Sequence, residues 1–131
     1  MTIEMTLLAW SLVLAAVQIL LFDVARTGQY GIKWNTGARD ETMPPLSAVA
    51  ERLSRAQANL YETLPLFIGA VLALHVMEIS TPSTQLGAQL WFWGRVVYVP
   101  LYAFGVRMLR SIVWLASFAG LIMLIAALIS A

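Results

Sequence analysis

Apolar and polar positions fall in long blocks along this chain. Four predominantly apolar blocks cover residues 5–22, about 58–77, about 86–105 and 112–131. A helix of about 20 residues crosses about 30 Å of hydrocarbon, and in lipid every backbone N–H and C=O must be paired within its own helix. The pattern therefore predicts an all-α membrane protein in which residues 1–131 form one domain of four transmembrane helices. The longest connection, about residues 23–47, is predicted to be a loop.

The composition agrees with a membrane protein and narrows the function. Hydrophobic residues make up 60% of the chain and charged residues 11%, against about 45–50% and about 25% in soluble domains. A net charge of +1 with few basic residues does not favour nucleic-acid binding. Because the chain has no cysteine, any thiol chemistry needs a thiol that a ligand brings.

The basic residues predict how the helices are oriented. Lys and Arg are absent from the N-terminus, from the turn "EISTPSTQ" and from the C-terminus. The positive-inside rule then makes the loop over about residues 23–47 cytoplasmic and places both termini outside the cytoplasm. The seven basic residues of the cytoplasmic side are Arg26, Lys33, Arg39, Arg52, Arg55, Arg107 and Arg110.

Polar residues interrupt the second apolar block at helical spacing. In "RAQANLYETLP", Arg55, Asn59 and Glu62 stand at i, i+4 and i+7, so they share one helix face, and Arg52 extends that face toward the cytoplasm. An ionisable residue at membrane depth costs about 2.5–3.5 kcal/mol and is normally paired or faces a wet cavity. A purely structural alternative has Arg55 reach the interface while Glu62 pairs with Arg95.

A second polar stripe lies in the third block. Arg95, Tyr98 and Tyr102 stand at i, i+3 and i+7, although an aromatic belt at the membrane interface explains the tyrosines equally well. Together the two stripes suit a small zwitterionic ligand with excess carboxylate. Arg side chains would bind carboxylates, Glu62 an ammonium and Asn59 a peptide group.

Three stretches of the chain resemble the MAPEG family, membrane-associated proteins in eicosanoid and glutathione metabolism. "ERLSRAQANLYETLPLF" is similar to the family's second-helix signature, and "NTGARDETMPPLSAVAERL" and "GRVVYVPLYAFGVRMLRSIVW" resemble bacterial members. The resemblance covers nearly the whole chain. The residues that match the signature are Glu51, Arg52, Arg55, Ala56, Asn59 and Glu62.

The resemblance implies a four-helix homotrimer in the bacterial inner membrane, with glutathione between neighbouring subunits near the cytoplasmic face. It implies that Arg110 stabilises the glutathione thiolate, with Arg107 as the fallback because one insertion or deletion separates the alignment from eukaryotic members. Arg26 would add a carboxylate contact, although "ARTG" departs from the paired basic residues of some relatives. The implied glutathione-binding residues are Arg26, Arg52, Arg55, Asn59, Glu62, Arg95, Tyr98 and Tyr102.

The implied function is a glutathione transferase that acts on a lipophilic electrophile from the bilayer. Conjugation, peroxide reduction and isomerisation all begin from the same thiolate, so the sequence does not choose among them. The alternative is a non-catalytic membrane protein that presents a lipid or a glutathione-like ligand. A small multidrug transporter is disfavoured because the first block has no carboxylate between Glu4 and Asp23. His75 and Glu78 form an incomplete ligand set, so no metal site is predicted.

Overall fold

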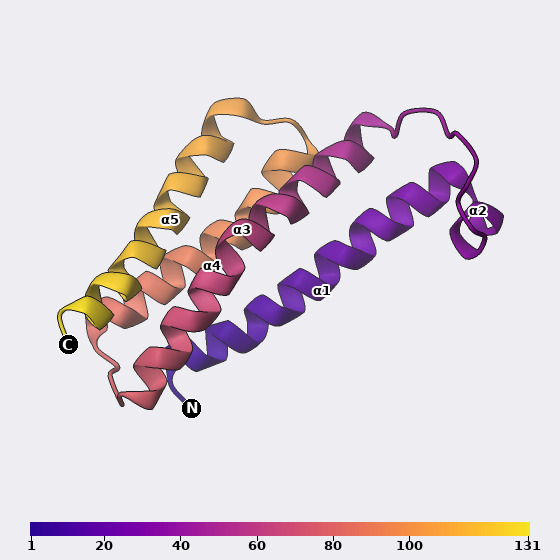
Figure 1. Cartoon of the computed structure of the whole chain (residues 1–131). Helices are drawn as coiled ribbons and strands as arrows, with labels where there is room; N and C mark the ends of the chain where they lie inside the picture. The colour runs from indigo at the N-terminus through magenta and orange to yellow at the C-terminus, as the bar shows by residue number, and fades with distance from the viewer.

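The computed structural model describes all 131 residues, and every regular element in it is a helix. Four long helices lie lengthwise against one another. A short helix, the second in chain order, lies beyond the bundle at the far end of the first helix (Figure 1). The predicted all-helical fold is confirmed. The helices are α1 (Ile3–Tyr30), α2 (Ile32–Thr36), α3 (Ala48–Val76), α4 (Pro82–Ala103) and α5 (Arg107–Ile129).

The helices do not coincide with the apolar blocks, which corrects the predicted bounds. α1 continues to Tyr30 and α2 occupies part of the predicted loop over 23–47, so that loop is shorter than expected. α3 starts at Ala48, well before the block that begins near residue 58, because Ser47 caps it by accepting a hydrogen bond from the Ala50 N–H at 3.2 Å. Hydrophobicity marks only the part of a helix at hydrocarbon depth, whereas capping residues mark its ends.

Three of the long helices, α1, α3 and α5, are long and apolar enough to cross a membrane. α4 has 22 residues, about 33 Å of helix at 1.5 Å each, but is not one of these three. Both termini and the α3–α4 turn lie at one end of the bundle, and the other two connections lie at the opposite end (Figure 1). The basic side chains of the connections are therefore gathered at one end.

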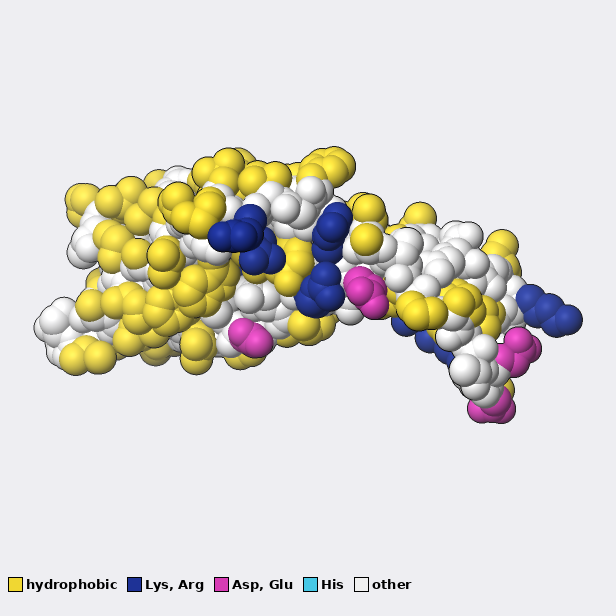
Figure 2. All heavy atoms as spheres, turned by 90° about the horizontal axis from the view of Figure 1, so that it is seen from above, with side chains coloured by type: hydrophobic (Ala, Val, Ile, Leu, Met, Phe, Trp, Pro, Cys, Tyr) yellow, Lys and Arg dark blue, Asp and Glu magenta, His cyan; other side chains and the backbone are white.

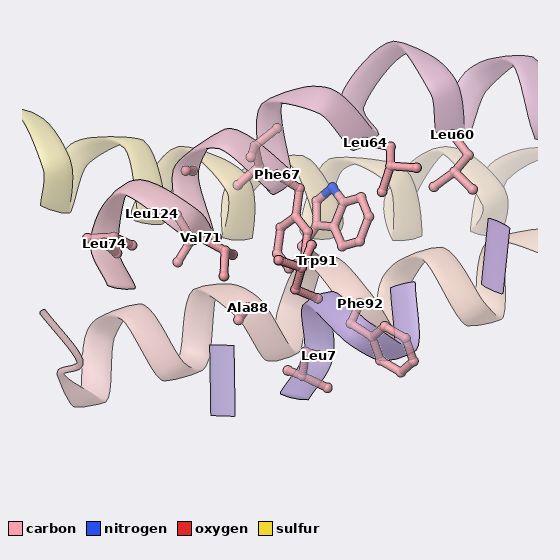
Figure 3. Close-up of a cluster of buried hydrophobic side chains, with 13 residues drawn as sticks. Leu7, Leu60, Leu64, Phe67, Val71, Leu74, Ala88, Trp91, Phe92 and Leu124 are labelled. Atoms are coloured by element: carbon pink, nitrogen blue, oxygen red, sulfur yellow. The ribbon is translucent and has the colours of Figure 1, made fainter. Parts of the chain in front are cut away.

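The core lies between the four long helices and is centred on two aromatic rings. Phe67 of α3 stacks on Trp91 of α4 with ring centroids 3.9 Å apart and planes 6° apart, and both side chains are buried. Leu7 of α1 and Leu124 of α5 join the same cluster from the other two helices (Figure 3). Because all four helices contribute, the core sets their relative rotation and so the position of every polar side chain on them.

α4 and α5 pack closely because small residues face each other along their contact. A methyl group added to Gly94 would lie 2.8 Å from the Ser117 Cβ, and one added to Gly120 would lie 2.8 Å from the Leu90 Cβ and collide with the Gly87 backbone oxygen. The Ser117 hydroxyl donates to the Trp91 carbonyl at 2.9 Å across the same contact. Small residues that allow such backbone approach are typical of membrane helix pairs.

At the end that carries the termini, a buried carboxylate joins α1 to α4. Glu4 is 2% exposed, and its oxygens accept hydrogen bonds from the Thr84 hydroxyl at 2.6 Å and the Ser80 hydroxyl at 3.1 Å. The N-termini of both helices also favour a negative charge here. This contact fixes the start of α1 against the start of α4.

Replacing Gly120 by Ala should destabilise the bundle, because the added methyl group forces α4 and α5 apart. Overpacking of this kind costs about 1–3 kcal/mol, which would appear as a lower midpoint of thermal unfolding in detergent micelles. Gly69→Ala in α3 is the matched control, since an added methyl group there meets nothing within 4 Å. Equal midpoints for the two variants would contradict this account of the α4–α5 contact.

Candidate functional site

A basic cavity of about 390 Å³ opens at the end of the bundle opposite the termini. The start of α3, the end of α4 and the start of α5 meet there, and each helix start contributes two arginines spaced three residues apart. Figure 2 shows most of the visible Lys and Arg side chains gathered near the middle of this face, beside the large apolar surface on the left. The residues that line the cavity are Arg52, Arg55, Tyr102, Gly105, Arg107 and Arg110.

The tight turn between α4 and α5 shapes one wall of this basic cavity. Gly105 has a φ of 72°, in the left-handed region that favours glycine. A methyl group on Gly105 would lie 3.2 Å from the Arg52 guanidinium carbon, and Arg52 Nη1 lies 3.5 Å from the Ala103 carbonyl. Gly105 therefore allows both the turn and the close approach of Arg52 to it.

The ring of Tyr102 lies close to two of the guanidinium groups. The Arg110 guanidinium carbon is 4.5 Å from the ring centroid and that of Arg55 is 5.9 Å from it. A cation over an aromatic face is attracted by the ring quadrupole. Tyr102 thus holds an arginine of α3 and an arginine of α5 on the same small surface.

The basic cavity carries more positive charge than its own carboxylates balance. Arg55 pairs with Glu51 at 3.7 Å, and both side chains are about half exposed, at 56% and 48%. Such an exposed ion pair contributes little to stability. Arg52, Arg107 and Arg110 form no ion pair within the chain. Guanidinium groups bind carboxylates bidentately, so the arrangement suits a small ligand with more than one carboxylate.

A buried polar chain leads from the basic cavity into the bundle. Tyr102 meets Tyr98 edge to face, with centroids 5.4 Å apart, and the Arg95 guanidinium carbon lies 4.7 Å from the Tyr98 ring centroid. Arg95 is 2% exposed and donates from Nη1 to Asn59 Oδ1 at 2.9 Å, while its Nε and Nη2 have no partner. A buried charge without a carboxylate is costly.

Trp114 is a member of this polar group that sequence reasoning missed. Its indole Nε1 donates to Asn59 Oδ1 at 2.9 Å, so α5 and α4 both bond the same amide of α3. The available signal was spacing: Trp114 follows Arg110 by four residues and therefore shares its helix face.

Two predicted site residues neither line the basic cavity nor form a hydrogen bond or ion pair with the polar chain that leads from it. Glu62 is exposed on α3 and forms no ion pair, so the alternative in which it pairs with Arg95 is wrong for the single chain. Arg26 binds Asp23 at 3.0 Å, with its guanidinium carbon 4.9 Å from the Phe22 ring centroid, near the protruding end of α1.

The ends of the bundle differ in chemistry. His75 and Glu78 line a cavity of about 240 Å³ beside Glu4 at the opposite end. No group of three or more His, Cys, Asp or Glu side chains is close enough to hold a metal ion.

Comparison with known proteins identifies the family. The chain matches the MAPEG family over residues 7–130, nearly its whole length. No curated protein and no solved structure matches it. The apolar helices and the family match together make this an integral membrane protein. The family includes glutathione transferases and related enzymes. The protein therefore belongs to the MAPEG family, as its sequence motifs predicted.

Proposed function

We propose that the protein is a membrane-bound glutathione transferase that stabilises the glutathione thiolate for attack on a lipophilic electrophile. The observation that carries the proposal is the convergence of four arginines on one cavity, three of them without an ion pair. Family membership supports it, because the family works in glutathione and eicosanoid metabolism.

The chemistry of the site fits glutathione, which has two carboxylates, one ammonium group and one thiol. Arg52 and Arg55 would hold carboxylates, Asn59 the peptide group, and Tyr98 and Tyr102 would contact the tripeptide. The buried, partly unpaired donors of Arg95 add positive potential behind them. A cavity of about 390 Å³ is within the usual range for small-ligand sites.

Glu62 and Arg26 support a site shared between copies of the chain. Both are assigned here to glutathione, Glu62 to its ammonium group and Arg26 to a carboxylate, yet neither lines the cavity of its own chain. A neighbouring subunit in a homotrimer would bring such side chains to the edge of the cavity. The trimer is therefore part of the proposal.

Arg110 is the residue proposed to stabilise the thiolate. A free thiol has a pKa of about 8.5, and an adjacent guanidinium lowers it by favouring the anion, which is the nucleophile. Arg110 is half-buried and rests on Tyr102, whereas Arg107 is exposed, so Arg110 is better fixed in place. Glutathione supplies a sulfur electron pair that forms a bond to an electrophilic carbon as the leaving group departs, and the thiol proton passes to solvent.

The electrophile would reach the sulfur from the bilayer. An apolar groove of about 360 Å³ runs between α4 and α5. Val113 lines it and lies one helical turn from Arg110. A lipophilic molecule in this groove would be close to the proposed thiolate, which gives a physical reason for the enzyme to sit in a membrane.

Two substitutions should separate binding from thiol activation. Arg55→Ala should raise the dissociation constant for glutathione about tenfold or more, since it removes a charge-assisted pair with a carboxylate. Arg110→Ala should leave that constant within a few-fold and lower turnover of a lipophilic electrophile by about 10²–10³, as expected for loss of one group that stabilises developing charge. Equilibrium dialysis and a conjugation assay in detergent would measure the two quantities.

Lys33→Ala is the control for this pair, because Lys33 is a basic residue of the same end and lies outside the basic cavity. Unchanged glutathione binding in both Arg55→Ala and Glu62→Ala would defeat the assignment of the site. Binding without turnover of any electrophile would favour the non-catalytic alternative, in which the protein presents a lipid or a glutathione-like ligand. Loss of turnover in Arg107→Ala alone would transfer the thiolate role to Arg107.

We further propose that all four long helices cross the bacterial inner membrane with both termini outside the cytoplasm, because the basic residues gather at the opposite end. Alkaline phosphatase, active only outside the cytoplasm, should be active when fused after Ala131 and inactive when inserted after Gly37. A fluorescent protein that folds in the cytoplasm should show the reverse. An active phosphatase after Gly37 would contradict the orientation, and termini on opposite sides would contradict four spans.

A further inference from the structure

The amide of Asn59 is held by two donors from two different helices. Arg95 Nη1 of α4 and Trp114 Nε1 of α5 each donate to Asn59 Oδ1 at 2.9 Å. An amide oxygen has two lone pairs. Two hydrogen bonds therefore fill the acceptor side of Asn59.

The two donors also determine which way the amide faces. Neither a guanidinium nor an indole N–H can accept a hydrogen bond. If the amide turned over, its NH₂ group would face two other donors and both hydrogen bonds would be lost. Because an unpaired buried polar group costs about 1–3 kcal/mol, this orientation is strongly preferred.

We infer that Arg95 and Trp114 are positioning residues that lock Asn59 so that it offers a ligand N–H donors and no acceptor. The free Nδ2 group makes no hydrogen bond within the chain, and Asn59 is only partly buried. The group that it recognises is therefore a carbonyl or carboxylate oxygen. This inference rests on the proposed glutathione site, and it specifies which atoms of the ligand Asn59 meets.

The charge of Arg95 also favours a ligand oxygen at Asn59. Its guanidinium is 2% exposed, has no carboxylate partner and keeps Nε and Nη2 unpaired beside the amide that it holds. A buried cation of this kind raises the positive potential at Asn59 and disfavours an ammonium group there. The donor-only amide and the buried cation thus both select an oxygen.

Replacing Asn59 by Asp should distinguish the hydrogen bonds that hold the side chain from its contact with the ligand. Aspartate keeps an oxygen for Arg95 and Trp114, so the midpoint of thermal unfolding in detergent should be unchanged or higher. It replaces the outward NH₂ group by an oxygen, so the dissociation constant for glutathione should rise about tenfold or more. Asn59→Leu, which has a similar volume, should lower the midpoint and also lose binding.

Trp114 supplies a readout that does not depend on glutathione. Its indole N–H resonance, assigned in labelled protein by its absence in Trp114→Phe, should move in Asn59→Leu and keep its hydrogen-bonded shift in Asn59→Asp. Trp114→Phe itself should weaken glutathione binding about three- to tenfold, because one of the two hydrogen bonds that fix the amide is lost.

The outcomes distinguish this inference from the proposed function. If Asn59→Asp were as destabilised as Asn59→Leu, or had a shifted indole resonance, the inference that Arg95 and Trp114 fix the orientation of the amide would be wrong. An Asn59→Asp variant that binds glutathione like the wild type would overturn the donor role. A wild-type protein that binds no glutathione would refute the proposed ligand and the donor role toward it, while the unfolding midpoints and the indole resonance would still decide on the lock.

Discussion

Placing a charge in hydrocarbon is energetically costly, and this cost determines where the charged residues of the chain can lie. Of the eight Lys and Arg residues, only Arg95 lies deep inside the helix bundle, and the rest lie on the connections or near helix ends at one end of the molecule. The helices could not be shifted by a few residues across the membrane without placing those charges in lipid. This constraint therefore concentrates guanidinium groups in a small volume.

Close packing of the helices arranges these guanidinium groups around one cavity. Gly87, Gly94 and Gly120 let α4 and α5 approach, and the Phe67–Trp91 stack sets α3 against α4. Three helix ends then meet at the basic cavity. Tyr102 and Tyr98 continue the contact inward to Arg95, so the surface proposed to bind carboxylates is backed by an aromatic and polar wall. This is the kind of support that a precisely held ligand needs.

The sequence predicted relations within a helix better than relations between helices. Helical periodicity placed Arg55 and Asn59 on one face, and the family motif correctly identified the family. Periodicity does not determine how one helix is rotated against another, so the hydrogen bond from Trp114 to Asn59 was missed. The exposure of Glu62 was missed for the same reason, because it depends on packing around α3. The pair of Arg26 with Asp23 lies within α1 at i, i+3 spacing, so helical periodicity could have predicted it. The roles of the site residues toward glutathione stay predictions.

The most direct test of the central claim is the ultraviolet absorbance of the glutathione thiolate after rapid mixing of glutathione with the purified protein at neutral pH. A free thiol is mostly protonated under these conditions, so a thiolate signal reports activation by the protein. The account predicts a fast rise in thiolate absorbance with the wild type and none with Arg110→Ala, although the variant still binds glutathione. No thiolate signal from wild-type protein saturated with glutathione would contradict the account.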